Sequence, residues 1–348
     1  MSGREAIAAL AAGLALAVAA GCGSDDETAA AEATAGNGSL TIYSGREEEL
    51  VGPLFELFEQ ETGVDVEVRY GDSAELAATI AEEGDNSPAD VFFAQDPGSL
   101  GAVEQEGLLA ELPGELLGRV DDRFRDPDGH WVGTSGRARV VVYNTDVLSE
   151  ADLPDTIFAF TDPKWKGKIG LPPTNASFQA FVTAMRLTEG EERTREWLEG
   201  IRANEPKIYE KNTPVVEAAA AGEIDVGFVN HYYLYLVKEE QPDAPVANYY
   251  LGGDDPGALV SVAGVAMLDD AEHGAEARRF VEFLLSEQGQ RFYAAEAEEA
   301  EYPLVEGIAP REGLPPLESL QGPDLELDAL GPELERTLEL LNEVGFTT

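Results

Sequence analysis

Hydrophobic and polar residues follow two periods along the first half of the chain. Short β-rich, buried or alternating runs, typical of strands, occupy residues 40–44, 64–68 and 89–93. Helical spacing of apolar residues, or a helical turn region, lies after each of them, at 47–61, 74–83 and 100–107. This alternation predicts an α/β fold with a parallel sheet and helices on both faces.

The pattern continues beyond residue 137 in a way that predicts a second lobe. Residues 137–143 form an apolar strand after a loop, which indicates a crossover into a new α/β unit. Further strands are expected at 169–171, 224–229 and 260–267. Helices are expected at 179–188, 214–221, 272–285 and 333–343. Ligands of such folds bind beyond the carboxyl ends of strands, so we expect the site in the cleft between two lobes.

The N-terminus has the pattern of an export signal. Arg4 precedes a small and aliphatic run over residues 6–20, which has the length of a signal-peptide core. The run ends at Ala19-Ala20-Gly21-Cys22, which resembles a bacterial lipobox. We therefore expect a signal peptide at 1–21, lipidation of Cys22, a flexible tether over 22–38 and anchoring to the outer face of the cell membrane, in the periplasm or cell-wall zone. The alternative is a chance cysteine after an ordinary signal peptide.

Composition excludes several classes of function. The 348 residues include 68 acidic and 23 basic side chains, a formal charge of -45, and the mean hydropathy is -0.20. Such a surface repels nucleic acids and anionic lipid headgroups. A single cysteine and three histidines provide neither an internal disulfide nor a histidine-rich metal site. The acidity itself is also explained by coding bias or adaptation to salt.

Enzyme motifs are absent, so no catalytic residue is predicted. The sequence has no G-x-S-x-G elbow, H-E-x-x-H helix, P-loop or dinucleotide fingerprint. The stretch 126–129 reads as a turn rather than a calcium loop, because the remaining oxygen ligands are missing. His130 and His273 are expected to be solvated.

Adjacent tyrosines stand where a strand gives way to a helix. The strand at 224–229 ends in Asn230-His231-Tyr232-Tyr233-Leu234-Tyr235. Neighbouring side chains diverge in a regular strand or helix, so Tyr232 and Tyr233 can converge only where the backbone changes character. Phenolate is a hard anionic donor that suits ferric iron. The alternative from composition and spacing alone is an aromatic packing cluster.

Seven segments together resemble the ferric-iron-binding proteins of bacterial ABC transporters. In collinear order from about residue 40 to 303 they are Tyr43-Ser44-Gly45-Arg46, Ser87-Pro88-Ala89-Asp90-Val91, residues 135–143, residues 164–170, Gly222-Glu223-Ile224-Asp225, Asn230-His231-Tyr232-Tyr233 and Glu301-Tyr302-Pro303-Leu304. The resemblance implies a two-lobe, type II, transferrin-like periplasmic binding fold that closes on ferric iron, Fe(3+). It also implies a synergistic carbonate or phosphate, an ABC transporter permease as partner, and a monomer.

The resemblance also implies the metal ligands. Tyr232 and Tyr233 match the paired tyrosines of the family. Some members have a histidine where this chain has Glu47 and a glutamate where it has Gln95, so Glu47 becomes a carboxylate candidate. Members without that histidine include some that use further tyrosines, which makes Tyr43 and Tyr143 candidates; strand packing is the alternative for both.

An anion pocket is expected beside the tyrosines. A helix that opens after Thr174-Asn175 offers free amides and the positive end of its dipole, and arginines hold anions bidentately. The expected residues are Asn175, Ser177, Asn212, Asn230, Arg46, Arg137 and Arg139. Ion pairing with carboxylates is the alternative for Arg137 and Arg139.

These inferences lead to a transport protein with two lobes. We expect an N-lobe from 39–138 and 264–305 and a C-lobe from 139–263 and 306–348. We expect the permease to recognise the form that has closed around ferric iron. We expect no bond in a substrate to be made or broken. The alternative function is a binding protein of the same fold for a small organic or phosphorus-containing anion. A secreted enzyme with paired carboxylates is the third hypothesis.

Overall fold

The computed structural model describes residues 38–296 and 300–347. The expected signal peptide, Cys22 and most of the tether lie outside these described residues. Within them, no helix is long and apolar enough to cross a membrane.

The described chain alternates strands and helices as its pattern predicts. The strands are β1 (Ser39–Ser44), β2 (Asp65–Tyr70), β3 (Val91–Ala94), β4 (Trp131–Asn144), β5 (Ile169–Leu171), β6 (Lys207–Ile208), β7 (Val226–Asn230), β8 (Val246–Tyr249), β9 (Val260–Met267) and β10 (Tyr302–Pro303). The helices are α1 (Glu48–Thr62), α2 (Ser73–Glu83), α3 (Pro97–Gln105), α4 (Gly114–Leu117), α5 (Ala176–Glu189), α6 (Glu191–Ala203), α7 (Asn212–Ala220), α8 (Tyr233–Glu240), α9 (Gly274–Leu284), α10 (Glu287–Arg291) and α11 (Leu334–Val344). Helices α4, α6 and α10 and strands β6, β8 and β10 are additions to the predicted elements.

The strands follow the order β2-β1-β3-β9-β4-β7-β5-β6. The parallel pairing expected for the early strands is confirmed, since β1 runs parallel to both β2 and β3. In the second half, β5 runs parallel to β6 and β7. Strands β4 and β9 differ from that expectation, because they run antiparallel to each other and to their outer neighbours. The fold is therefore mixed α/β, with parallel outer strands and an antiparallel centre.

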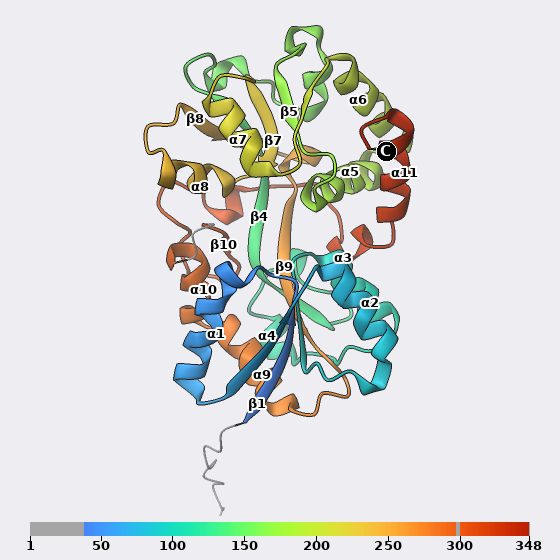
Figure 1. Cartoon of the computed structure of the whole chain (residues 1–348), viewed down its shortest axis with the longest axis vertical. Helices are drawn as coiled ribbons and strands as arrows, with labels where there is room; N and C mark the ends of the chain where they lie inside the picture. Colours follow the sequence, from blue (N-terminus) through green and yellow to red (C-terminus); the bar gives the residue numbers. More distant parts are fainter. Residues whose placement is uncertain (1–37, 297–299, 348) are drawn as a thin grey trace, which may run out of the picture. The chain divides into compact units, whose positions relative to one another are not determined.

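Strand β4 belongs to both halves of the fold. Its first part, Trp131 to Ala138, pairs with β9, and its second part, Arg139 to Tyr143, pairs with β7. Figure 1 shows β4 and β9 running beside each other between the two groups of helices. We call the elements around β1, β2, β3 and β9 the first lobe, and those around β5 to β8 the second lobe. The change of partner at Ala138 puts Arg137 and Arg139 on either side of the junction, and their spacing of two residues puts them on one face of the strand.

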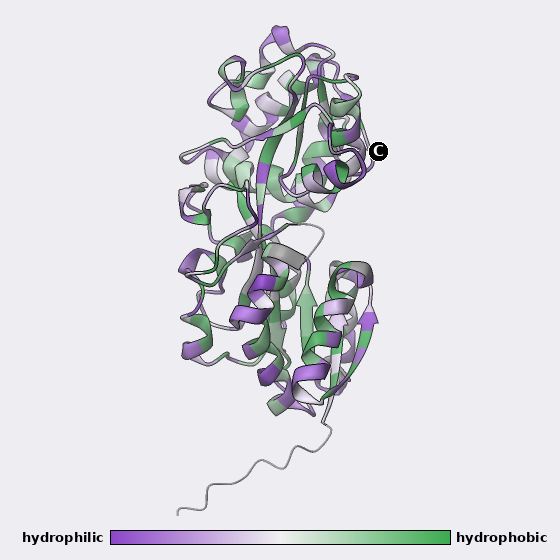
Figure 2. Cartoon of the chain, turned by 90° about the vertical axis from the view of Figure 1, so that its left-hand side faces the viewer, coloured by the Kyte–Doolittle hydropathy of each residue, from purple (hydrophilic) through white to green (hydrophobic). Residues whose placement is uncertain are grey.

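Aromatic side chains fill the core of each lobe. In the first lobe, Phe280 of α9 packs against Phe55, Phe58 and Phe93, with ring centroids 5.2–6.3 Å away. In the second lobe, Phe181, Trp197 and Phe228 are buried in a separate cluster. Figure 2 shows mostly hydrophobic strands and hydrophilic residues spread over the helices and loops.

The segment after residue 305 contributes to both cores. Leu320 and Leu327 pack into the first core, whereas Leu340 and Leu341 of α11 pack into the second. In Figure 1, α11 and the C-terminus lie beside α5 and α6. The lobe boundaries expected from sequence stay a prediction.

Replacing Phe280 with alanine should lower the free energy of unfolding by about 3–5 kcal/mol, because the side chain is fully buried and the cavity would lie among three other rings. Urea unfolding followed by circular dichroism measures the change. The control is Leu338→Ala on α11, where the side chain is 39% exposed and the loss should stay below about 0.5 kcal/mol. Similar losses in both variants would contradict this packing.

Candidate functional site

The two predicted tyrosines meet at the corner between β7 and α8. Strand β7 ends at Asn230 and α8 begins at Tyr233, so the chain changes from extended to helical backbone within three residues. Tyr232 has helical φ and ψ of -72° and -23°. The Tyr232 hydroxyl donates to the Tyr233 hydroxyl at 3.2 Å, and the two rings lie 4.3 Å apart between centroids. The local backbone change therefore brings both phenol oxygens together, with Tyr232 buried and Tyr233 half-buried.

Arg139 places a buried cation beside this corner. Its residue pairs with Asn230 across β4 and β7. Its Nη1 donates to Asn230 Oδ1 at 3.0 Å and to Ser177 Oγ at 3.2 Å, and its Nη2 donates to the Phe228 carbonyl at 2.9 Å. The guanidinium thus has three neutral hydrogen-bond acceptors.

The charge of Arg139 is coupled to the two tyrosines. Burial lowers the pKa of Arg139 to about 10, and attraction to ionised Tyr232 and Tyr233 opposes part of that shift. Because the interaction is mutual, a charged Arg139 also favours the phenolate forms of its two neighbours. The arrangement can therefore stabilise negative oxygen at the corner.

The start of α5 brings further predicted anion-binding residues to Arg139. Asn175 caps the helix by accepting from the Ser177 amide at 3.0 Å, and the Ser177 hydroxyl donates to Asn175 Oδ1 at 2.6 Å. Asn212, at the start of α7, donates from Nδ2 to Asn175 Oδ1 at 3.0 Å and to Ser177 Oγ at 3.2 Å. Its own Oδ1 is buried and lacks a hydrogen-bond partner in the described part of the chain. Asn175, Ser177, Asn212, Asn230 and Arg139 thus form one connected polar group.

The other two predicted arginines lie across the junction and pair with a carboxylate. Arg46 forms a two-pronged ion pair with Glu301, from Nη1 to Oε1 and from Nη2 to Oε2, each at 3.1 Å. Arg137 Nε lies 3.7 Å from Glu301 Oε1, and its Nη2 donates to the Gln95 carbonyl. Burial raises the pKa of Glu301, but Arg46 and Arg137 together hold it below its ordinary value.

Sequence reasoning missed the role of Glu301. The resemblance includes Glu301 in the segment 301–304 but implies no role for it. In the structure it is fully buried and supplies negative charge to Arg46 and Arg137. The signal available from sequence was an acidic residue at the start of an otherwise apolar run.

The two additional candidate tyrosines lie apart from the corner. The Tyr43 hydroxyl donates to Glu83 at 3.1 Å and accepts from Arg69 Nη1 at 3.1 Å. Tyr143 pairs with Val226 at the opposite end of β7 from Asn230. It lies four positions along β4 from Arg139, which corresponds to about 13 Å. Neither side chain joins the Tyr232–Tyr233 group.

Glu47 and Gln95 flank the Arg46–Glu301 group in the first lobe. Glu47 precedes α1 with an exposed side chain that makes no capping hydrogen bond. Gln95 follows β3, and its Oε1 is buried without a hydrogen-bond partner among the described residues. Both residues therefore have oxygen atoms that the described fold does not use.

His231 connects the corner to two other segments. Its Nδ1 accepts from the Ala138 amide at 3.2 Å, which assigns the proton to Nε2, and Nε2 then donates to the Ala300 carbonyl at 3.0 Å. Burial lowers the pKa of His231 to about 4. This imidazole is therefore neutral at pH 7 and holds the tyrosine corner to β4 and to the segment before β10.

Iron-free protein should lose stability between pH 6.5 and 4 because of His231. The unfolded chain takes up a proton there below about pH 6.5, whereas the folded chain resists protonation down to about pH 4. Between pH 7.5 and 5.0 this group should lower the unfolding free energy by about 2 kcal/mol. His231→Gln keeps one donor and one acceptor but cannot titrate. Urea unfolding at both pH values should therefore give a smaller loss in this variant, and equal losses would contradict the assignment.

This chain is similar to known proteins both in its sequence and in its fold. The model of the family described as bacterial extracellular solute-binding protein matches residues 86–319. The "Fe(3+)-binding periplasmic protein" of Serratia marcescens is 32% identical, over 91% of this chain and 93% of its own. The "Major ferric iron-binding protein" of Neisseria meningitidis serogroup B is 34% identical, over 90% and 95%.

Solved structures show the same likeness. Iron-bound HitA from Pseudomonas aeruginosa has a TM-score of 0.81 and 36% identity, over 88% of this chain and 99% of its own. A Trichodesmium protein (IdiA, FutA) in complex with iron and citrate has a TM-score of 0.78 and 28% identity, over 89% and 100%. The chain belongs to the family of bacterial extracellular solute-binding proteins.

Proposed function

We propose that this chain captures ferric iron outside the cytoplasm and delivers it to an ABC permease. The observation that carries the proposal is the pair of phenol oxygens, Tyr232 and Tyr233, 3.2 Å apart. An octahedral cation with metal–oxygen bonds of about 2.1 Å has neighbouring oxygens about 3 Å apart. One metal ion can therefore contact both oxygens after little adjustment.

The chemistry of the corner suits a hard trivalent cation. A free phenol has a pKa of about 10, so both tyrosines must release protons when they bind iron. The buried charge of Arg139 favours the resulting phenolates. Acid would favour iron release by reprotonating them, and so would reduction, because ferrous iron binds phenolate less strongly.

A small anion fits beside the iron. Arg139 and the amides at the start of α5 attract negative charge. Asn212 Oδ1 needs a hydrogen-bond donor, which hydrogencarbonate or hydrogen phosphate supplies through its remaining proton. We assign this synergistic anion to Asn175, Ser177, Asn212, Asn230 and Arg139. Arg46 and Arg137 share the carboxylate of Glu301, which balances one of their two positive charges, so they attract an anion less than they would without it.

The relatives support iron as the solute. The Serratia and Neisseria proteins are named for ferric iron, and the Pseudomonas and Trichodesmium structures contain iron. The Trichodesmium complex also contains citrate, a carboxylate anion.

The remaining features of the mechanism follow from two lobes joined by β4 and β9. We assign the N-lobe to 39–138 and 264–305 and the C-lobe to 139–263 and 306–348, with Leu320 and Leu327 of the last segment packing into the core of the first lobe. Closure would bring Glu47 toward the iron as a further oxygen ligand, and the anion or water would fill the remaining positions. Binding then stabilises the closed form that the permease recognises.

We further propose that the protein is a monomer, makes and breaks no substrate bond, and is anchored through lipidated Cys22.

A second candidate is a binding protein for a small organic or phosphorus-containing anion. The group around Arg139, Ser177 and Asn212 favours it, because hydrogen-bonding groups converge there on a buried cation. In this case the tyrosines would stack on the ligand. Thermal stabilisation by phosphate or a phosphonate, with none by iron, would favour this second function.

Ferric citrate should turn the purified protein orange-red, because phenolate-to-iron charge transfer absorbs visible light. The double variant Tyr232→Phe, Tyr233→Phe should stay colourless and retain no iron after desalting. Tyr143→Phe is the matched control, and it should keep both colour and iron because residue 143 lies about 13 Å along β4 from Arg139. Colourless wild-type protein that holds no iron would overturn the proposed function.

Arg139→Gln should weaken iron retention by at least about tenfold, or about 1.4 kcal/mol, because it removes the charge that favours phenolate and anion together. Competition with citrate, followed by the visible absorbance, measures the change. Arg186→Gln is the control, since Arg186 is also largely buried in the second lobe but pairs with Glu333. Loss of iron from both variants alike would indicate a general folding defect instead.

A further inference from the structure

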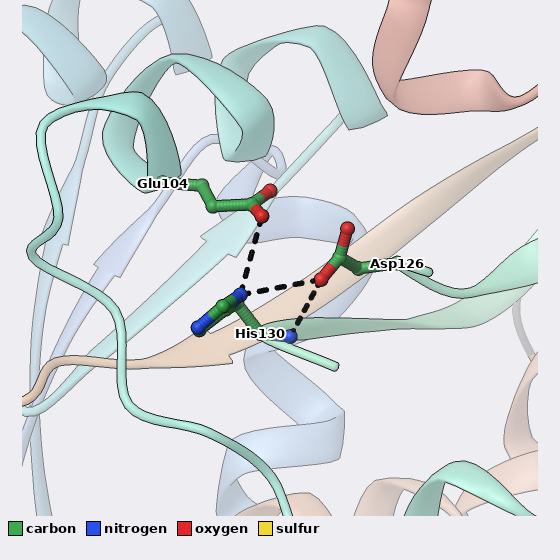
Figure 3. Close-up of side chains that lie close together, drawn as sticks. All are labelled: Glu104, Asp126 and His130. Atoms are coloured by element: carbon green, nitrogen blue, oxygen red, sulfur yellow. Dashed lines mark hydrogen bonds and ion pairs between the residues drawn. The ribbon is translucent and has the colours of Figure 1, made fainter. Parts of the chain in front are cut away.

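Two carboxylates and an imidazole converge in the first lobe, outside the site described above. Glu104 lies in the last turn of α3, Asp126 in the turn before β4, and His130 immediately before β4. Figure 3 shows both carboxyl groups directed at the same nitrogen of His130. The turn predicted at 126–129 is present, with the Gly129 amide donating to the Asp126 carbonyl at 3.2 Å. Both histidines expected to be solvated are only partly exposed and contact carboxylates: His130 is 31% exposed and contacts Glu104 and Asp126, and His273 is 32% exposed and contacts Asp90.

The spacing of the three donor atoms suits a metal ion. His130 Nδ1 lies 3.2 Å from Glu104 Oε1 and 3.4 Å from Asp126 Oδ2, and all three donors lie within 4.8 Å of one another. Ligands held about 2.0–2.2 Å from a tetrahedral ion are separated by about 3.4 Å. The His130 amide also donates to Asp126 Oδ2 at 2.8 Å, which fixes that carboxylate.

A third carboxylate, that of Asp328, adds negative charge near Glu104. Asp328 lies in the 3-10 helix Leu327–Leu330, which packs on α3, and its Oδ1 atom is buried without a hydrogen-bond partner in the described chain. Burial raises the pKa of Glu104, and the charges of Asp126 and Asp328 raise it further, while His130 opposes them. Two carboxylates thus contact one imidazole in a partly buried place while a third adds negative charge nearby, and such a concentration of negative charge is costly unless a cation compensates for it.

We propose that Glu104, Asp126 and His130 bind a divalent transition-metal cation, with Zn²⁺ as the best match. A mixed set of one imidazole and two carboxylates suits such ions, whereas Ca²⁺ and Mg²⁺ prefer oxygen ligands alone. Three protein ligands leave a fourth position for water. The ion would fasten α3 to the start of β4. Its role is structural and independent of the proposed iron site.

The test uses the purified chain, freed of metal with a chelator and titrated with ZnCl₂. Calorimetry should show one tight equivalent, and the melting temperature should rise by about 3 °C or more at saturation. The Tyr232→Phe, Tyr233→Phe variant should bind Zn²⁺ equally well, which separates this site from the iron site. His130→Gln and Glu104→Gln should each weaken binding at least tenfold.

His273→Gln is the matched control, because this histidine has nearly the same exposure and its Nδ1 lies 3.1 Å from buried Asp90. It belongs to no described three-ligand group, so the variant should bind Zn²⁺ like the wild type. If a His130 variant does not fold, Co²⁺ can be bound to the wild-type protein in place of Zn²⁺. Its visible absorption spectrum should then be that of a site with nitrogen and oxygen ligands. Absence of Zn²⁺ binding, unchanged binding in the His130 and Glu104 variants, or loss in the tyrosine variant would overturn the proposal.

Discussion

The charged guanidinium of Arg139 is buried away from water. The groups around it must therefore replace the hydration that it has lost. Its partners among the described residues are neutral oxygens, including those of Asn230 and Ser177, together with the phenols that can ionise beside it. The β4–β7 register sets Arg139 opposite Asn230, two residues before Tyr232. One strand pair therefore fixes both the cation and the tyrosine corner, and the electrostatics of the site depend on that register.

Two arginines on the same face of β4 have different electrostatic surroundings. Arg137 faces Glu301, which it shares with Arg46, so one of these two positive charges is balanced by a buried carboxylate. Arg139 has no such carboxylate among its described partners, and its positive charge remains available to a ligand. In a chain of formal charge -45, this local difference matters more than the total. The overall charge attracts cations of many kinds, whereas the proposed iron site would favour a cation that binds the two phenolates together with an anion held by Arg139.

The sequence predicted those elements whose periodicity was strong, such as β9, and it predicted that Tyr232 and Tyr233 meet at a strand-to-helix change. It missed α6, because that segment is mostly charged, although Trp197, Leu198 and Ile201 supply a helical apolar stripe. The antiparallel centre was also missed, since strand direction depends on where the chain returns and not on local pattern. Long-range pairs such as Arg46 with Glu301, 255 residues apart, leave no local signal.

Both lobes are assembled from distant parts of the chain, and this determines when they can fold. The first core needs β9 and α9 and also Leu320 and Leu327, while the second needs Leu340 and Leu341 of α11. A nascent chain that has reached β8 therefore lacks buried residues of both cores. Neither lobe can reach its final packing until nearly the whole polypeptide has been synthesised, although domains commonly fold in order from the N-terminus. Until that last segment is available, apolar residues of both cores stay exposed, so the unfinished chain is open to aggregation and to binding by chaperones.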